Sequence, residues 1–513
     1  MRIALRQLIL LLSASCITAT AAPKYNLLVI QTDEHNYRTL SCYRQLLPEG
    51  DYYRGTKVLE TPNIDWIAKN GALCTSFYAT TPVCSPSRAA LVSGRYPQNT
   101  DVVSNDIPLN DSIVTFAEIL RREGYATGYA GKWHLDGTGK PQWAPKRNFG
   151  FSDNRFMFNR GHWKMFNDTP DGPRVASTDK RGQPDYGLDG ADDKTFATDW
   201  LADKTIGFIN ANKSAPFCYM VSFPDPHGPN TVRSPYDTLY KAAKVPTPDS
   251  TLNKTPQQTP PWAALTPRLT ADTVRTIMPK YYGMVKCLDD NIGRILETLR
   301  TNGQIDRTVI AFTSDHGDLC GEHGRLNKGV PYEGSARIPF LLYFPGRVKP
   351  GTIVNEALSC VDFLPTIMSL LRVKTAGKEQ GRDASRLFTG KDPRWNDIAF
   401  VRSTGSGPGW VMAVSDKLKL VFASRGKPWL FDLNADPDEL DNRIDIPRYR
   451  EDVRRLSKAL RDYGVQQNDE SVLSPKIQAD LDWAIGTEIA YRDVQATSPG
   501  PQGGKSKKRK RKE

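Results

Sequence analysis

The stretch Asn26–Asp33, with the sequence N-L-L-V-I-Q-T-D, decides the fold. Its apolar residues follow one another directly instead of alternating with polar ones, which is typical of a strand buried on both faces of a parallel sheet. Polar residues gather at its carboxyl end, where Thr32 and Asp33 lie. Because ligands of such sheets bind at the carboxyl edge, we expect the chemistry of the protein to be found there.

Similar apolar runs and helical patterns alternate as far as about residue 370. They predict strands over 126–130, 217–223 and 309–313, and helices over 62–70, 116–123 and 280–300. The first helix is marked by Thr61 as its cap, Pro62 at its first position and Gly71 at its end. We therefore predict an α/β fold with a large mixed or parallel sheet sandwiched by helices.

The pattern changes after residue 389. Short alternating segments at 410–414, 418–422 and 429–433 and a helix around 449–463 predict a smaller C-terminal antiparallel sheet with a helix. The chain is thus divided into an N-terminal domain over 23–388 and an α+β subdomain over 389–490. Two long segments of the first domain, 137–192 and 233–268, are rich in Pro, Gly, Asp and Trp and lack periodicity. Such insertions usually shape a pocket.

The beginning of the chain has the features of a targeting segment. Residues 1–22 combine Arg2 and Arg6 with an apolar run at 8–12 and small residues at 19–21, which predicts a signal peptide and export to the periplasm or the medium. Lipid attachment at Cys16 is the less favoured alternative, because the residues before it fit a lipoprotein box poorly. No later stretch approaches the ~18 apolar residues of a membrane span.

The net charge of +12 owes much to the other end of the chain, where residues 505–512 hold seven basic side chains. Residues 491–513 are predicted to form a basic, disordered tail. This tail could contact nucleic acid or an acidic glycan, but nothing in the sequence requires a nucleic acid partner. The body of the protein is only mildly basic, which suits an anionic substrate and, more simply, describes an ordinary solvated surface.

The cysteines form an odd set once the signal peptide is removed. Without Cys16, seven remain, so at least one thiol stays unpaired or is used in chemistry. The other six could form disulfides after export, or they could be buried free thiols, and the sequence leaves both alternatives open.

Polar residues at the ends of the predicted strands form a candidate site. Three of the six histidines, His134, His227 and His316, follow predicted strands directly, next to Lys132, Asp225 and Asp315. One histidine in such a place would be structural, whereas three at separate strand ends favour a shared site. The pairs Asp33-Glu34 and Asp315-His316 supply three carboxylates, which favour a hard divalent cation over zinc. The simpler alternative is that both aspartates cap turns.

Cys84 lies in the segment C-S-P-S-R over 84–88, where Pro86 can begin a helix that continues to Ser93. The thiol would then lie near a helix N-terminus, where free N–H groups and the helix dipole favour an anion. A Cys-His enzyme would explain this thiol. It would not explain the neighbouring carboxylate set or the positions of Pro86 and Arg88.

These motifs together resemble the type I, formylglycine-dependent sulfatases of the alkaline phosphatase superfamily. The segment 84–88 matches the family signature C-x-P-S-R, and L-V-S-G-R follows at 91–95. The resemblance extends over about residues 25–465 and includes G-K-W-H-L at 131–135, T-S-D-H-G at 313–317, G-E-H-G at 321–324, K-G at 328–329, V-D-F-L-P-T at 361–366 and W-L-F-D-L at 429–433. It implies the alkaline-phosphatase-like fold and makes residues 23–388 the catalytic domain.

The resemblance also implies what the unpaired thiol is for. In this family the cysteine of C-x-P-S-R is oxidised to formylglycine by a formylglycine-generating enzyme or an anaerobic sulfatase-maturating enzyme. The hydrated aldehyde carries two hydroxyls: one attacks sulfur, and the other then collapses to the aldehyde and expels sulfate. A serine would lack this second step. Cys84 is therefore expected to act as the precursor of a nucleophile rather than as a thiol.

By the same resemblance, Ca²⁺, with Mg²⁺ as the alternative, would be held by Asp33, Glu34, Asp315, His316 and residue 84. Arg88 would orient the nucleophile, and Lys132 and Lys328 would neutralise charge on the sulfuryl group. His134 would accept a proton when the diol collapses, and His227 would protonate the leaving alcohol. Two further histidines, His35 and His162, are candidate substrate contacts, with a structural role open for each.

One ligand position departs from the family pattern. Many members have Asp-Asp or Asp-Gln where this chain has Asp33-Glu34. The second ligand is thus longer than Asp by one methylene and, unlike Gln, is charged. Calcium tolerates such variation because its coordination is flexible.

The predicted function is hydrolysis of a sulfate ester on a carbohydrate, since export, a mildly basic body and aromatic-rich insertions suit a sulfated glycan outside the cell. A phosphonate monoester or phosphodiester hydrolase of the same superfamily is the alternative, because a similar site can handle phosphoryl groups. A non-catalytic glycan-binding relative is a third alternative, which the complete set of polar residues disfavours.

Overall fold

The computed structural model describes residues 24–263, 269–390, 394–407, 409–486 and 491. The predicted signal peptide, including Cys16, and residues 492–513 of the predicted basic tail lie outside this range. Within the described part of the chain, no helix combines the length and apolarity needed to cross a bilayer.

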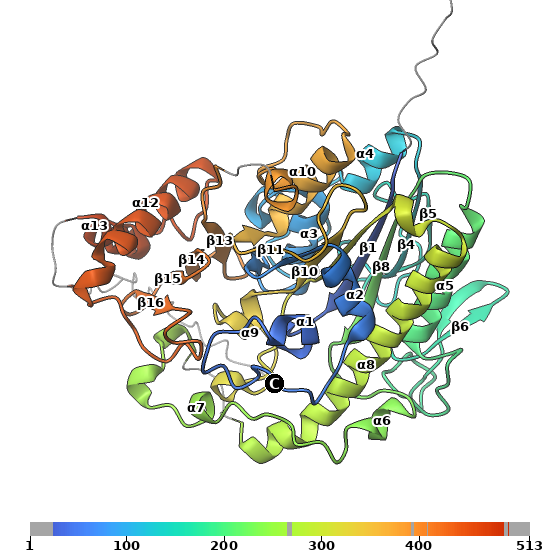
Figure 1. Cartoon of the computed structure of the whole chain (residues 1–513), viewed down its shortest axis with the longest axis horizontal. Helices are drawn as coiled ribbons and strands as arrows, with labels where there is room; N and C mark the ends of the chain where they lie inside the picture. The colour runs from blue at the N-terminus through green and yellow to red at the C-terminus, as the bar shows by residue number, and fades with distance from the viewer. Residues whose placement is uncertain (1–23, 264–268, 391–393, 408, 487–490, 492–513) are drawn as a thin grey trace, which may run out of the picture.

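A large sheet forms the centre of the molecule (Figure 1). Its eight strands lie in the order β11 (Thr352–Val354), β2 (Ala72–Cys74), β10 (Phe340–Tyr343), β9 (Thr308–Ser314), β1 (Asn26–Asp33), β8 (Phe217–Pro226), β4 (Ala126–Lys132) and β5 (Asp153–Phe158). Strand β10 pairs antiparallel with both neighbours, and every other pairing in the sheet is parallel. The prediction of a large mixed sheet is therefore confirmed.

Strand β1 shows how helices come to cover both faces of this sheet. Leu27 and Val29 point into one hydrophobic core, and Leu28 and Ile30 point into another on the opposite face. The first core contains α3 (Cys84–Ser93), α4 (Phe116–Arg122) and α10 (Cys360–Leu371). The second contains α2 (Pro62–Asn70), α5 (Ala197–Ala211) and α8 (Ala271–Thr301). An uninterrupted apolar strand is required because each face of the sheet is buried.

A smaller antiparallel sheet follows in the C-terminal part, coloured orange to red in Figure 1. It consists of β13 (Ala399–Arg402), β14 (Trp410–Val414), β15 (Leu418–Ala423) and β16 (Trp429–Asp432). One face joins the first core together with α12 (Arg450–Gln466) and α13 (Pro475–Ile485). The other face packs on Val330 and Tyr332, which follow β9 in the chain. The small sheet thus supports a loop of the large one.

The remaining elements are short. They are α1 (Ser41–Arg44), β3 (Phe77–Tyr78), β6 (Phe166–Thr169), β7 (Gly172–Val175), α6 (Tyr236–Leu239), α7 (Asp249–Leu252), α9 (Glu333–Ala336), β12 (Leu358–Ser359) and α11 (Ser385–Phe388). Strands β6 and β7 form a hairpin within the first insertion, and β3 pairs with β12.

The predicted elements are found, with differences at their ends. The predicted helix over 280–300 begins earlier, at Ala271, and continues through Pro279. Strands β2, β10 and β13 and helix α13 were not predicted, because segments of three or four residues carry too little periodic pattern and because α13 follows a stretch without clear signals. All seven cysteines of the described range are free, and six of them are buried, so the free-thiol alternative is confirmed.

Candidate active site

The carboxyl ends of neighbouring strands bring the predicted polar residues together. In the register of β1 and β9, Thr32 lies opposite Ser314, so that Asp33 and Asp315 follow at the same edge. Strand β4 ends at the same edge with Lys132, whose Nζ lies 2.6 Å from Oδ2 of Asp33. The edge predicted from the first strand is therefore where the charged residues gather.

Helix α3 presents Cys84 to this group. The helix begins at Cys84, after an extended Val83, and ends at Gly94, whose φ of 66° suits a residue without a side chain. The Cys84 Sγ lies 3.2 Å from Nε2 of His316 and 3.6 Å from Nζ of Lys132. Burial alone would raise the pKa of this thiol, but nearby positive charges, led by Lys132, hold it well below its usual value. The position is thus built to favour an anion.

Arg88, one helical turn after Cys84, joins the two aspartates. Its guanidinium donates from Nη2 to Oδ2 of Asp33 and from Nε to Oδ2 of Asp315, each over 2.9 Å. Its Nη1 donates to Gln31, to Ser222 and to the carbonyl of Lys132. A buried guanidinium is tolerated only when its donors are satisfied. Arg88 therefore fixes both carboxylates in one orientation.

This orientation leaves donor atoms that could hold a metal ion. Ligand atoms of Asp33, Cys84, Asp315 and His316 all lie within 4.8 Å of one another. Among the described residues, Oδ1 of buried Asp33 has no hydrogen-bond partner. The Nδ1 of His316 lies 3.0 Å from the carbonyl of Gly317, and Nε2 faces the two aspartates. Two of the four donors are carboxylate oxygens, which suit a hard divalent cation, so the residues present fit the expected ion.

A second group of residues adjoins the candidate metal ligands and contacts them through Lys132. The rings of His162 and His227 stack in parallel with 3.4 Å between their centroids. Each ring also contacts an ammonium group: Nε2 of His162 lies 2.7 Å from Nζ of Lys132, and Nε2 of His227 lies 2.7 Å from Nζ of Lys328. Burial and Lys132 hold the pKa of His162 well below its usual value. The neutral His162 ring can then accept a hydrogen bond from the ammonium group of Lys132.

Glu34 belongs to this second group. Its carboxylate lies 2.9 Å from Nε2 of His227 and 3.1 Å from Nζ of Lys328. Burial would raise its pKa, but His227 and Lys328 lower it to about 2. Glu34 was predicted as a metal ligand, and the structure places its carboxylate against the side chains of His227 and Lys328 instead of in the four-residue cluster. Its left-handed backbone, with φ of 61°, turns the chain at the end of β1.

His134 also lies near Cys84. Its Nε2 is 3.1 Å from Oδ1 of Asp106, and its carbonyl accepts a hydrogen bond from Ser85, the neighbour of Cys84. A hydrogen bond from His134 contributes to the low pKa of the Cys84 thiol. An imidazole that is oriented by a carboxylate in this way is suited to accept a proton from a group at residue 84.

The structure therefore distinguishes an inner half and an outer half of the site. The inner half consists of Asp33, Cys84, Arg88, Lys132, Asp315 and His316, which are at most 2% exposed. The outer half consists of Glu34, His162, His227 and Lys328, of which the last three are partly exposed. One predicted contact was wrong. His35 is fully buried, and its ring nitrogens face Thr32 and Thr39, so it cannot touch substrate.

Several supporting residues were not predicted. Gln31 and Ser222 receive hydrogen bonds from Arg88, and Asp106 orients His134. Lys164 is fully buried, pairs with Asp225 over 2.6 Å and donates to the carbonyl of His227. Gln31 and Ser222 lie near strand ends and could have been suspected, whereas Asp106 and Lys164 lie in segments without a periodic pattern.

Comparison with known proteins identifies the family. The sequence profile of the sulfatases matches residues 26–373, which is more than half of the chain. The chain belongs to the sulfatase family. A second profile, of the C-terminal region of N-sulphoglucosamine sulphohydrolase, matches residues 321–466. The protein is thus a hydrolase of sulfate esters, as its motifs predicted.

Several sulfatases are similar to this chain over most of its length. The chain is 29% identical to an arylsulfatase of Clostridium perfringens, and the match covers 79% of this chain and 89% of the relative. It is also 29% identical to an ulvan-active sulfatase of Formosa agariphila, with 80% and 78% covered. An N-acetylglucosamine-6-O-sulfatase of Bacteroides thetaiotaomicron is 25% identical, with 86% and 87% covered.

Solved structures confirm the alkaline-phosphatase-like sulfatase fold. A structure in complex with its substrate D-glucosamine-2-N,6-O-disulfate superposes with a TM-score of 0.70 at 21% identity, over 87% of this chain and 99% of the other. A phosphonate monoester hydrolase of Agrobacterium radiobacter superposes with a TM-score of 0.67 at 23% identity, over 88% and 97%. The fold is thus shared by enzymes that act on different ester groups.

Proposed function

We propose that this sulfatase removes sulfate from a sulfated carbohydrate, with a formylglycine made from Cys84 as nucleophile and a bound divalent cation. The observation that carries the proposal is the place of Cys84. Its Sγ lies beside His316 and Lys132 at the centre of a buried group that contains two carboxylates. A nucleophile held there lies near the positive charges of Lys132 and Lys328, which suit attack on an anionic ester.

The outer half would supply charge and protons to the leaving group. Lys132 and Lys328 each place an ammonium group at Nε2 of one of the stacked imidazoles, where the two charges can neutralise a sulfuryl group. The Nε2 of His227 faces this space and can protonate the oxygen of the departing alcohol when the S–O bond breaks. Lys164 donates a hydrogen bond to the backbone carbonyl of His227 and so limits its movement.

Residue 84 would be restored by His134, next to the inner half, after the alcohol has left. The diol form of formylglycine has a second hydroxyl, and loss of its proton lets the C–O bond to sulfate break and the aldehyde form again. His134, oriented by Asp106, is the residue placed to accept that proton. Arg88 keeps both aspartates in place through this cycle.

The cation would be held by Asp33, Asp315 and His316 together with residue 84, and Ca²⁺ is the expected ion, with Mg²⁺ as the alternative. When bound, it would act as a Lewis acid toward a sulfate oxygen. Glu34 remains a candidate fifth ligand, although its carboxylate pairs with His227 and Lys328.

A carbohydrate substrate is supported by the names of the relatives, which include an ulvan-active sulfatase and an N-acetylglucosamine-6-O-sulfatase. Export is part of the proposal, through a signal peptide over residues 1–22. A formylglycine-generating or anaerobic sulfatase-maturating enzyme would be the partner that converts Cys84.

The test is a comparison of substrates with protein co-expressed with its maturation enzyme. We expect turnover of an aryl sulfate and of one class in a panel of sulfated sugars, and little turnover of an aryl phosphonate. We also expect the peptide that contains Cys84 to have the mass of formylglycine. Dominant phosphonate turnover would favour the alternative function, and an unmodified thiol in fully active protein would contradict the mechanism.

A further inference from the structure

A cavity of about 900 Å³ lies in the first insertion, beside the outer edge of the large sheet. Its lining residues all fall within 141–184, in strand β5, the β6–β7 hairpin and the loops around them. None of the residues of the inner or outer half lines it. The insertion that was predicted to shape a pocket therefore does so, at a place separate from Cys84.

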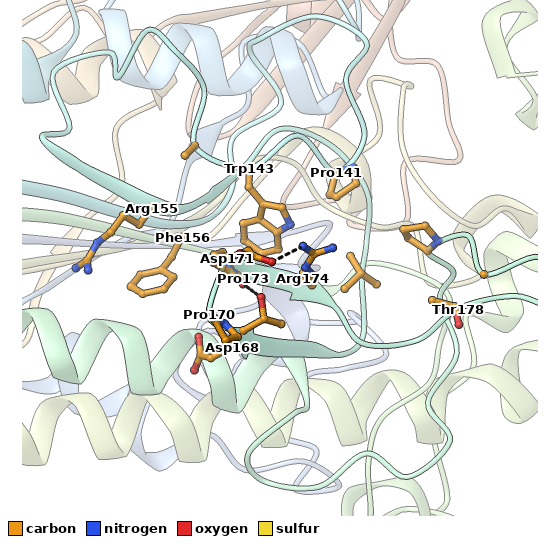
Figure 2. A pocket seen from close by; sticks show the side chains of 16 residues that line it. Pro141, Trp143, Arg155, Phe156, Asp168, Pro170, Asp171, Pro173, Arg174 and Thr178 are labelled. Atoms are coloured by element: carbon orange, nitrogen blue, oxygen red, sulfur yellow. Dashed lines mark hydrogen bonds and ion pairs between the residues drawn. The ribbon is translucent and has the colours of Figure 1, made fainter.

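The walls of this cavity combine flat apolar groups with paired charges. Figure 2 shows Trp143 between Phe156 and Arg174, with Arg174 joined to Asp171. The Arg174 guanidinium lies 3.4 Å from the Asp171 carboxylate, and both side chains are more than 60% exposed. The hairpin therefore offers hydrogen-bond donors and acceptors side by side at the mouth of the cavity.

The charges of the lining residues balance. Two guanidinium groups, of Arg155 and Arg174, are matched by two carboxylates, of Asp168 and Asp171. A site for a sulfate group would have an excess of cations, which is absent from these walls. Hydroxyl groups, in contrast, both donate and accept hydrogen bonds. The face of a sugar ring that presents C–H groups packs well on an aromatic ring. The lining suits an uncharged sugar unit.

Backbone pairing within the large sheet links the cavity wall to the active site. Trp143 forms a β-bridge with Phe158, and Phe158 is the partner of Lys132 in the pairing of β5 with β4. Since paired strands are ~4.8 Å apart, the backbone of Trp143 is about 10 Å from that of Lys132. A sugar chain of a few units is long enough to reach from one place to the other.

A series of side-chain contacts connects the cavity to the outer half. Lys140 precedes Pro141 of the cavity wall, and its Nζ lies 5.1 Å from the ring of Trp163 and 4.9 Å from that of Tyr186. The Tyr186 ring is in turn 6.4 Å from the ring of His162 in the outer half. This series of contacts therefore begins at the cavity and ends at the stacked imidazoles.

We propose that the cavity is a distal subsite, which binds a hydroxyl-bearing sugar unit of the same chain whose sulfate group lies at Cys84. This inference rests on the proposed function and narrows it: the substrate is an oligosaccharide or polysaccharide rather than a single sulfated sugar. Binding energy gained in the cavity then raises kcat/KM for long substrates only, because short ones cannot reach it.

Two variants test the subsite, with one control in the same loop. Thr178→Trp places a large ring in the cavity, and Arg174→Ala removes a donor at its mouth; both positions are exposed, so folding is preserved. Arg181→Ala is the control, because Arg181 is exposed and close in sequence but does not line the cavity. The substrates are an aryl sulfate and oligosaccharides of two, four and six units prepared from ulvan, carrageenan and heparin.

We expect wild-type kcat/KM to rise with chain length for the oligosaccharide that is hydrolysed. Thr178→Trp should lower kcat/KM for the longest substrate about tenfold, Arg174→Ala should lower it less, and neither should change turnover of the aryl sulfate. Equal kcat/KM at all lengths in the wild type, or an equal loss on all substrates, would overturn the inference while leaving the sulfatase function intact.

A binding measurement separates the two proposals. Desulfated oligosaccharides of six units from the same sources are titrated against the Cys84→Ala protein, and tryptophan fluorescence is followed. Binding that Thr178→Trp abolishes supports the subsite without any reference to turnover. Absence of binding by every oligosaccharide would contradict the subsite, whereas absence of sulfate release from all substrates would contradict the proposed function itself.

Discussion

The inner and outer halves of the active site are built in different ways. The inner half is held by the ends of parallel strands and by the first turns of α3, and its charges satisfy one another through Arg88. The outer half comes from loops: Glu34 and His227 follow strands, His162 lies in the first insertion, and Lys328 lies in the loop after β9. The residues of the inner half are thus positioned by the large sheet and α3, whereas the residues of the outer half are positioned by loops, which tolerate more sequence change.

Support for the outer half comes from the small C-terminal sheet. The Nζ of Lys419, on β15, donates to the carbonyl of Pro331 over 2.7 Å and pairs with the buried carboxylates of Glu333 and Glu439. Trp410 on β14 donates from Nε1 to the carbonyl of Gly329. The loop that carries Lys328 is therefore fastened by contacts from a different sheet, whereas the inner half is held by the large sheet and by α3.

The largest expected effect lies at the centre of the inner half. Cys84→Ala should lower kcat on every sulfate ester by about 10⁴-fold or more, because the nucleophile is lost rather than weakened. Kinetics of aryl sulfate hydrolysis measure the loss, with circular dichroism as a control for folding. Activity that stays within tenfold of the wild type would show that residue 84 is not the nucleophile.

The next effect tests whether the inner half acts as one unit. Arg88→Lys keeps the charge but cannot donate to both aspartates at once, so we expect about 10³-fold lower kcat and about 3 kcal/mol lower free energy of unfolding. Urea denaturation measures the second quantity. Arg121→Lys is the matched control, since Arg121 forms an exposed pair with Glu118. Equal stability of the two variants would contradict the role of Arg88 as a buried clamp.

A smaller effect tests the outer half. His227→Asn should lower kcat about 10²-fold on a sugar sulfate, whose alcohol leaves poorly without a proton. On an aryl sulfate with an acidic phenol, which leaves as an anion, the same variant should lose little. The ratio of the two losses is the measurement. Equal losses on both substrates would assign His227 to binding rather than to protonation.

The smallest effect on activity is expected at the support of the outer half, where the change appears as a pH dependence of stability instead. Burial and the carboxylate of Glu333, against the pull of Lys419, raise the pKa of Glu439 to about 7 from 4.5. The folded protein therefore binds more protons than the unfolded chain between these values, so this contribution is complete below pH 4.5 and is lost as the pH rises toward 7. The expected loss is about 3 kcal/mol.

Glu439→Gln should remove that decline, so the difference in free energy of unfolding between wild type and variant should change between pH 5 and pH 7. Urea denaturation at both pH values measures it, and Glu451→Gln, at an exposed position of α12, is the control. A constant difference at both pH values would contradict a raised pKa for Glu439.

The two halves also differ in how far the sequence predicts them. Asp33, Lys132 and Asp315 could be placed at one edge because each directly follows an apolar strand, and parallel strands end together. His162 could be named only as a candidate, since the insertion around it has no period that fixes where it folds. The error at His35 has the same cause: the sequence places it beside Asp33 but does not show that its ring turns toward Thr32 and Thr39.

Lys328 illustrates a further limit. It became a candidate through its motif, but the contacts that hold its loop come from Trp410 and Lys419, about 80 and 90 residues later in the chain. No local pattern links such distant positions, because their pairing depends on how the small sheet packs against the large one. Support of this kind becomes visible only in the folded structure.

The contacts of the Lys328 loop with β14 and β15 also bear on the order in which the active site assembles during synthesis. During synthesis, the large sheet and its inner half can assemble from the first 370 or so residues, while the small sheet has not yet left the ribosome. Until that sheet docks, the loop that carries Lys328 lacks its contacts with Trp410 and Lys419. The nascent chain would therefore have the strand ends of the inner half in place before the Lys328 loop is fastened to β14 and β15.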